Sequence, residues 1–217
     1  MKKIVSPKKA ASLIKPDSSL MIGGFLRCGS PYKVIDEIVK NRTDGLTLIA
    51  NDTSLPDCDR GRLIGNHLVK KAIVTHIGTN PETVRQMNAG ELEVDLVPMG
   101  TLVEKIRCAG AGLGGFLTPT GIGTVVEQGH DVVEIEGKKY LLETPLKADF
   151  AIIYATKADR FGNAFLDGTT RNFNTVMATA AQTVILEPEE LSDTPLDPAI
   201  ITIPGIFADY IAFEEEQ

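Results

Sequence analysis

Two glycine-rich segments contain the residues whose types and spacing most readily suggest chemistry. The first runs from Gly23 to Gly29, includes Arg27, and is followed by a Ser30-Pro31 pair that is typical of a helix start. A loop that joins a strand to a helix can present backbone N–H groups and the positive end of the helix dipole to an anion or a carbonyl oxygen. Glycines in such a loop can equally serve only to permit a sharp turn and close packing of the helix on the sheet.

The second segment, residues 110–115, matches the G-x-G-x-x-G pattern of dinucleotide-binding loops. That fingerprint must follow a strand and open a helix. Here a helix is expected before the glycines, and the stretch after them contains Pro119 and Gly121, which do not suit a first helical turn. We therefore interpret residues 110–123 as exposed backbone that a ligand or a partner chain can approach closely, and no Rossmann cofactor site is expected.

The chain offers no recognisable nucleophile and no metal site. No serine lies in a G-x-S-x-G motif, no H-E-x-x-H motif is present, and the three cysteines and three histidines lack zinc-ligand spacing. Glu82 and Glu104 are accounted for as helix-start residues, and nothing in the sequence singles out Glu127 or Glu143. The odd number of cysteines fits a reducing compartment better than a disulfide framework.

The overall composition excludes several classes of function. With 43% hydrophobic residues the chain can bury a sizeable core, and we expect residues 1–217 to form a single domain. A net charge of −7 and the absence of long basic runs argue against binding to nucleic acid or to anionic membranes. The longest apolar runs suit buried strands, and no apolar segment follows the basic N-terminus. We therefore expect no membrane span and no secretory signal, and a cytoplasmic location.

Apolar stretches alternate with helix signals along most of the chain. Helix starts are predicted at Ser30-Pro31, at Asn80-Pro81, and at a capping box over residues 101–104. An antiparallel hairpin is predicted from two short strands that flank a turn containing Gly137. The remaining strands are predicted at residues 19–22, 46–50, 72–75, 92–97, 150–155 and 183–186. The expected fold is α/β, with an open, mostly parallel sheet, flanking helices and a β-hairpin insertion.

Several motifs stand in a characteristic order along the chain. An apolar strand followed by G-G-F-x-x-x-G-x-P occupies residues 20–31. Further matching stretches lie at residues 49–53, 76–83, 100–104, 110–123, 157–163 and 171–174. Together they resemble the A (alpha) subunit of family I CoA-transferases, of the acetate or butyrate–acetoacetate type. The resemblance covers nearly the whole chain and rests on several independent motifs.

The resemblance implies a fold shared with sugar-phosphate isomerases and a heteromer of A and B subunits, often A2B2. In this family the catalytic glutamate becomes a glutamyl-CoA thioester and lies in an E-N-G motif of the B subunit, and the present chain has no Glu-Asn-Gly. No catalytic residue is therefore expected in this chain, and CoA is expected as a substrate, with no permanently bound cofactor. The residues implied to contact CoA are Gly23, Gly24, Phe25, Leu26, Arg27, Cys28 and Gly29.

Two further positions are implied to support the reaction. The family's counterpart of Asn51 lies beside the catalytic carboxylate, so Asn51 is expected to contact the acyl group. The family usually has Pro-Gln-Gly where this chain has Pro98-Met99-Gly100, and methionine cannot donate the amide hydrogen bond of glutamine. Either the acyl preference has shifted, or a water or neighbouring side chain fills the role, or the position is altered in this chain.

Other functions stay open at this point. A sugar-phosphate isomerase-like enzyme or a ligand-binding regulatory domain would share the fold class, which does not by itself determine function. The change at Met99 also leaves room for a chain that only supports the B subunit structurally. The motifs favour a transferase that acts on short-chain acids, with acetoacetate and either butyrate or acetate as the substrate pair.

Overall fold

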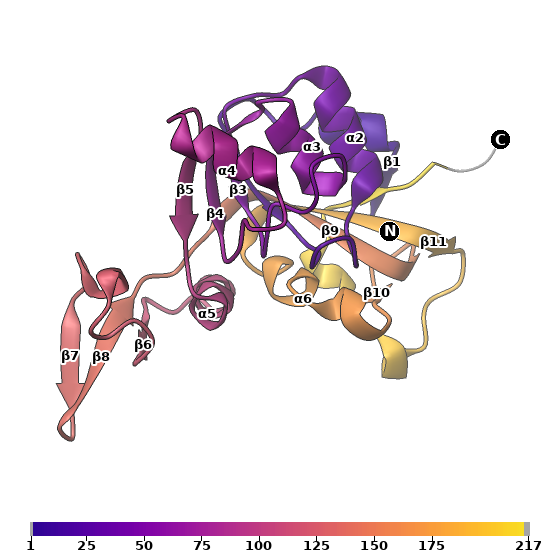
Figure 1. Cartoon of the computed structure of the whole chain (residues 1–217). Coiled ribbons are helices and arrows are strands. Elements are labelled where there is room, and N and C mark those ends of the chain that lie inside the picture. Colours follow the sequence, from indigo (N-terminus) through magenta and orange to yellow (C-terminus); the bar gives the residue numbers. More distant parts are fainter. Residues whose placement is uncertain (1, 215–217) are drawn as a thin grey trace.

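The centre of the structure, a computed structural model that describes residues 2–214, is a nine-stranded sheet (Figure 1). Eight strands form one parallel path in the order β1-β12-β11-β9-β2-β3-β4-β5, and β10 pairs antiparallel with β9. The strands are β1 (Lys3–Val5), β2 (Ser19–Ile22), β3 (Leu46–Ile49), β4 (Val69–Val74), β5 (Glu93–Leu96), β9 (Ala148–Asp159), β10 (Ala164–Phe165), β11 (Ala181–Ser192) and β12 (Tyr210–Ala212).

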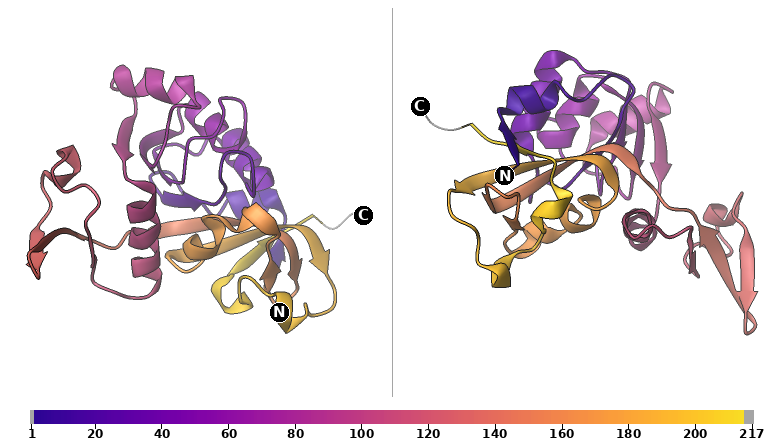
Figure 2. Two further views of the ribbon diagram at one scale, coloured as in Figure 1. Left: turned by 60° about the horizontal axis from the view of Figure 1, so that its bottom comes forward. Right: turned by 180° about the vertical axis from the view of Figure 1, so that it is seen from behind.

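Helices cover both faces of this sheet (Figures 1 and 2). Alternate residues of a strand point to opposite faces, so Leu20 and Ile22 of β2 belong to one hydrophobic core and Met21 to the other. One core lies beneath α1 (Pro7–Ala11), α2 (Tyr32–Asn41), α3 (Asp59–Gly65) and α4 (Pro81–Asn88), and the other beneath α5 (Met99–Gly110) and α6 (Asn174–Met177). Short 3-10 helices are η1 (Val125–Glu127), η2 (Gly168–Arg171), η3 (Pro198–Ile200) and η4 (Gly205–Phe207).

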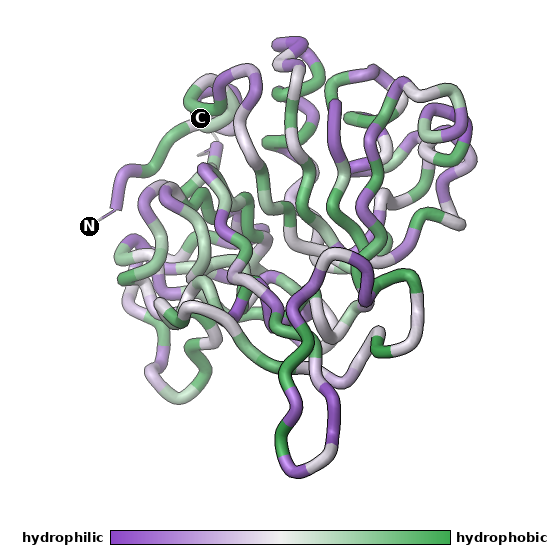
Figure 3. Tube along the Cα trace, turned by 90° about the vertical axis from the view of Figure 1, so that its left-hand side faces the viewer, coloured by the Kyte–Doolittle hydropathy of each residue, from purple (hydrophilic) through white to green (hydrophobic). Residues whose placement is uncertain are grey.

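A separate antiparallel sheet projects from this body (Figures 1 and 2). It has the order β6-β8-β7, with β6 (Phe116–Thr118), β7 (Val132–Ile135) and β8 (Lys138–Glu143). The turn between β7 and β8 consists of Glu136 and Gly137, whose φ angles of 51° and 77° suit a two-residue hairpin turn. The predicted hairpin insertion is therefore confirmed. Figure 3 shows stretches of hydrophobic residues, in green, along the projecting hairpin. Of these strands, Val132 and Ile135 of β7 are exposed.

The predicted helix starts have different outcomes. Asn80 caps α4 as predicted, because its side chain accepts hydrogen bonds from the backbone N–H groups of Glu82 and Thr83. The capping box over residues 101–104 is wrong: α5 begins two residues earlier, at Met99, and Pro98 precedes it. Thr101 is consequently buried within the helix, and Glu104 forms an ion pair with Arg107 instead.

The glycine-rich stretch of residues 110–123 is only partly irregular. Most of it lies at the surface, as expected, but Gly110 ends α5 and β6 pairs with β8. Within residues 2–214 no helix has both the length and the apolar character needed to cross a bilayer.

Candidate functional site

A pocket opens at the carboxyl ends of β2, β3, β4 and β5. Ligands commonly bind at this edge of an open parallel sheet, because the loops that follow the strands converge there. Residues 23–29, which we call the glycine loop, follow β2, whereas Asn51 follows β3 and Met99 opens α5 after β5. The pocket has a volume of about 310 Å³ and is lined by Phe25, Leu26, Asn51, Asp52, Thr75, His76, Thr79 and Met99.

This pocket brings together residues that the sequence named as candidates in three separate segments. Asn51 is almost fully buried in its wall, whereas Met99 and Phe25 are 45% and 43% exposed. Of the glycine loop only Phe25 and Leu26 line the pocket. Arg27 is exposed, and the thiol of Cys28 lies 3.1 Å from the hydroxyl of Thr169.

The glycine loop has a tightly folded backbone. Phe25 and Cys28 exchange two backbone hydrogen bonds of 3.0 Å, and the φ angles of Gly24 and Gly29 are 117° and 69°. These values lie in the region that favours glycine. Gly23 is required for a different reason: a Cβ atom there would lie 1.7 Å from Oδ1 of Asn174. The loop therefore needs Gly24 and Gly29 for their backbone conformation, and Gly23 because the side chain of Asn174 packs directly against it.

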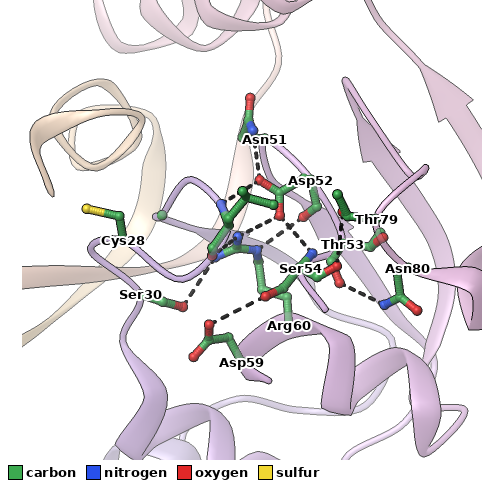
Figure 4. Close-up of polar contacts among 12 residues, drawn as sticks. Cys28, Ser30, Asn51, Asp52, Thr53, Ser54, Asp59, Arg60, Thr79 and Asn80 are labelled. Carbon is green, nitrogen blue, oxygen red and sulfur yellow. Dashed lines mark hydrogen bonds and ion pairs between the residues drawn. The ribbon is translucent and has the colours of Figure 1, made fainter. Parts of the chain in front are cut away.

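A buried arginine holds the glycine loop from one side (Figure 4). Arg60 of α3 is completely buried, and its Nη1 donates to the carbonyl oxygen of Gly23 at 3.0 Å and to the hydroxyl of Ser30 at 3.2 Å. Its Nη2 donates to the carbonyl oxygen of Leu26 and to Oδ1 of Asp52, both at 2.9 Å. Its Nε donates to the carbonyl oxygen of Asp52 at 3.1 Å. Every nitrogen of this guanidinium therefore has a partner.

Asp52 is the central acceptor of this cluster. Its Oδ2 accepts from the backbone N–H of Leu26 at 2.9 Å and from the side-chain amide of Asn51 at 2.8 Å. Its Oδ1 accepts from the backbone N–H of Ser54 at 2.7 Å, in addition to Arg60. Burial would raise the pKa of Asp52, but the charge of Arg60 and the hydrogen bonds from Leu26 and Asn51 hold that pKa below its ordinary value.

Two asparagines also hold the glycine loop. Oδ1 of Asn172 accepts from the backbone N–H of Gly24 at 3.1 Å, and its Nδ2 donates to the carbonyl oxygen of Cys28 at the same distance. The buried Asn174 donates to the carbonyl oxygens of Gly29 at 2.9 Å and Thr170 at 2.8 Å. The loop is therefore fixed between side chains that follow β3 and side chains that precede and open α6.

The N-terminus of α2 is already occupied by a carboxyl group of the chain itself. The buried carboxylate of Glu187 accepts from the backbone N–H groups of Lys33 at 3.0 Å and Val34 at 2.8 Å. Burial raises the pKa of Glu187 to about 7, against the opposing effect of these two hydrogen bonds. The sequence suggested that this helix end could take a ligand anion or carbonyl, and that expectation is corrected here, because Glu187 fills the position.

The pocket itself contains no free carboxylate. Asp52 is its one carboxylate among the lining residues, and four hydrogen bonds engage both of its oxygens. In the described part of the chain, no group of three or more histidine, cysteine, aspartate or glutamate side chains is arranged to hold a metal ion.

Several residues of this site were not singled out from the sequence. Arg60 lies in a run of charged residues that reads as a solvated surface, and no local pattern marks it as buried. Asn172 and Asn174 belong to the matched stretch at residues 171–174, which could have drawn attention to them. Glu187 lies within a strand, where a single acidic residue gives no signal of a helix cap.

Comparison with known proteins identifies the family. The family model for coenzyme A transferase matches residues 4–213. The chain is 46% identical over 215 residues to the acetate CoA-transferase subunit alpha of Escherichia coli (strain K12), covering 99% of this chain and 98% of that protein. It is 48% identical over 213 residues to the acetoacetyl-CoA:acetate/butyrate CoA transferase alpha subunit of Clostridium acetobutylicum, with 98% of each covered.

Solved structures share the fold. An acyl-CoA transferase from Escherichia coli O157:H7 aligns with a TM-score of 0.89 at 23% identity, over 98% of this chain and 47% of that one. Glutaconate coenzyme A-transferase from Acidaminococcus fermentans aligns with a TM-score of 0.83 at 22% identity, over 97% of this chain and 75% of that one. The chain thus spans about half the length of the first structure.

These matches confirm the predicted fold class and the resemblance drawn from the motifs. They favour a transferase over the sugar-phosphate isomerase-like and regulatory alternatives, because both curated relatives are CoA-transferase subunits over nearly their whole length. The chain belongs to the coenzyme A transferase family.

Proposed function

We propose that the chain is the alpha subunit of a CoA-transferase that moves CoA between acetoacetate and either acetate or butyrate. Support comes from the two alpha-subunit relatives and from the pocket at the carboxyl ends of β2 to β5. The observation that carries the proposal is the meeting of the glycine loop, Asn51 and Met99 in a pocket whose one carboxylate is fully engaged. A transferase site of this kind is completed by a partner that brings the nucleophile.

The chemistry divides between the two subunits as follows. A glutamate carboxylate of the beta subunit attacks the thioester carbonyl of the acyl-CoA and expels the CoA thiolate, which leaves an acyl-glutamyl anhydride. The thiolate then attacks the glutamyl carbonyl and releases the first carboxylic acid, so that CoA is held as a glutamyl thioester. The second acid takes CoA by the same steps in reverse.

The residues of this chain bind CoA and orient the acyl group. The glycine loop contacts CoA, and hydrogen bonds from Arg60, Asn172 and Asn174 hold its backbone in place, so the loop does not have to reorganise when CoA binds. Asn51 uses one hydrogen of its side-chain amide to bind Asp52, which leaves the second for the acyl oxygen. The pocket of about 310 Å³, with Phe25, Leu26 and Met99 in its wall, suits a short acyl chain.

We also propose an A2B2 assembly in the cytoplasm. A partner subunit is supported by the length of the solved acyl-CoA transferase chain. The present chain covers 47% of that chain, so a second subunit of similar size would correspond to the rest. The cytoplasmic location is supported by the three free cysteines, Cys28, Cys58 and Cys108, which fit a reducing compartment.

The test is an exchange assay with separately purified subunits. The chain alone, the beta subunit alone and the mixture are incubated with acetoacetyl-CoA and either acetate or butyrate, and the formation of the new acyl-CoA is followed. Exchange only in the mixture is expected. Exchange by this chain alone, or none in a mixture that forms a stable complex, would contradict the proposal.

A further inference from the structure

The buried Arg60 does not line the pocket, yet two of the four residues that it contacts, Leu26 and Asp52, do. Burying a guanidinium is costly unless its charge is paired and its N–H groups are satisfied. Here all of its contacts fall on Asp52 and on residues in or beside the glycine loop, namely Gly23, Leu26 and Ser30. Because these partners balance the cost of burying the charge, their location indicates which part of the structure Arg60 holds in place.

The carboxylate of Asp52 joins two parts of the pocket. The same oxygen, Oδ2, accepts from the backbone N–H of Leu26 in the glycine loop and from the side chain of Asn51. The other oxygen is held by Nη2 of Arg60. A shift of Arg60 therefore moves the loop directly, through Gly23 and Leu26, and moves Asn51 indirectly, through Asp52 (Figure 4).

We propose that Arg60 is the positioning residue that sets the glycine loop and, through Asp52, the side chain of Asn51 as one unit. This inference rests on the proposed function, because it assigns the loop to CoA and Asn51 to the acyl group. Arg60 touches neither substrate, and it acts by fixing the distance between the two places where the substrate is held.

Arginine suits this role in a way that lysine does not. Its planar guanidinium directs N–H groups along fixed directions, so one side chain reaches the carbonyl oxygens of Gly23 and Leu26 and the carboxylate of Asp52 together. A lysine ammonium has one nitrogen, which cannot occupy the positions of Nη1, Nη2 and Nε. The substitution Arg60→Lys therefore keeps the positive charge beside Asp52 and removes the simultaneous hold on the loop.

The test compares the two half-reactions of the reconstituted complex. The apparent kcat/KM for acyl-CoA describes the half-reaction that starts from the free enzyme, to which CoA has still to bind. The apparent kcat/KM for the carboxylic acid describes the half-reaction that starts from the enzyme to which CoA is already attached. Arg60→Lys is expected to lower the first on the order of 10²-fold, the cost of a displacement of about 1 Å at a reacting site. The second should fall by less, because CoA is then already attached covalently and the loss comes mainly from the displaced Asn51. The matched control is Asp159→Asn, which removes a buried carboxylate that accepts from backbone N–H groups of Phe161, Asn163 and Leu196.

Asp159→Asn is expected to lower the melting temperature without separating the two kcat/KM values. Equal losses for acyl-CoA and acid in Arg60→Lys, or a loss that follows the melting temperature as in the control, would overturn the inference. If Arg60→Lys does not fold, Ser30→Ala decides, because it removes a single contact with Nη1. The same selective loss, several-fold in size, is expected there, and unchanged kinetics would overturn the inference. An inactive wild-type complex would instead contradict the proposed function.

Discussion

The substitution Gly23→Ala tests the packing of the glycine loop most severely. The new Cβ would lie 1.7 Å from Oδ1 and 2.4 Å from Cγ of Asn174, so the asparagine must move. That side chain is completely buried and makes hydrogen bonds with Gly29, Thr170 and the backbone N–H of Tyr154. At about 1 kcal/mol for each hydrogen bond, its displacement should lower the free energy of unfolding by about 3 kcal/mol.

The assay is urea unfolding of the full chain, followed by circular dichroism. Gly114→Ala is the matched control, because no heavy atom lies within 4 Å of the added Cβ there, and it should change stability by less than about 0.5 kcal/mol. The double variant Gly23→Ala with Asn174→Ala should cost about as much as Asn174→Ala alone, since the clash has been removed.

Two results would refute this reasoning. One is a Gly23→Ala chain as stable as the Gly114→Ala control, which would mean that Asn174 moves without loss. The other is a double variant whose cost equals the sum of the two single costs, which would mean that the two residues act independently.

Three further predictions concern other parts of the structure. Met99→Gln restores an amide at the pocket wall, so the kcat/KM for acetoacetate relative to butyrate should rise about tenfold with stability unchanged, whereas an unchanged ratio would show that the position does not contact the acyl group. Because burial raises the pKa of Glu187 to about 7 from 4.5, its contribution to stability is full below about pH 4.5 and is lost as the pH rises through 7. Glu187→Gln should therefore remove about 3 kcal/mol of pH dependence between these values in urea unfolding, and a curve that keeps its slope would assign the effect to another group. Asn80→Ala removes the cap of α4 and a hydrogen bond to Thr53, and should lower the free energy of unfolding by about 1–2 kcal/mol; a loss below about 0.3 kcal/mol would contradict the capping role.

The strands of the central sheet were predictable because their signal is local. A run such as residues 150–155 is apolar throughout and short, which is typical of a strand buried on both faces. Asn80-Pro81 likewise carries its helix start in two adjacent residues. The edge strand β1 and its neighbour β12 were missed, since each has three residues and takes its partners from distant parts of the chain.

The candidate site was predictable only in part. Asn51 and the glycine loop follow strands that neighbour each other in the sheet, and the order of those strands brings the two segments together. Arg60 and Glu187 depend on tertiary contacts, because a buried charge is distinguished from a surface charge only by partners that are distant in sequence. Residues 101–104 show that a local motif can also mislead. Their sequence matches a capping box, but the helix begins earlier, after Pro98.

The division of the active site between two subunits is tested most directly by locating the bound CoA. The reconstituted complex is incubated with acetoacetyl-CoA in the absence of an acceptor acid, and the intact masses of both chains are measured. The expected result is a CoA adduct on the beta subunit, lost on treatment with hydroxylamine, with the mass of this chain unchanged. A CoA adduct on this chain would contradict the account.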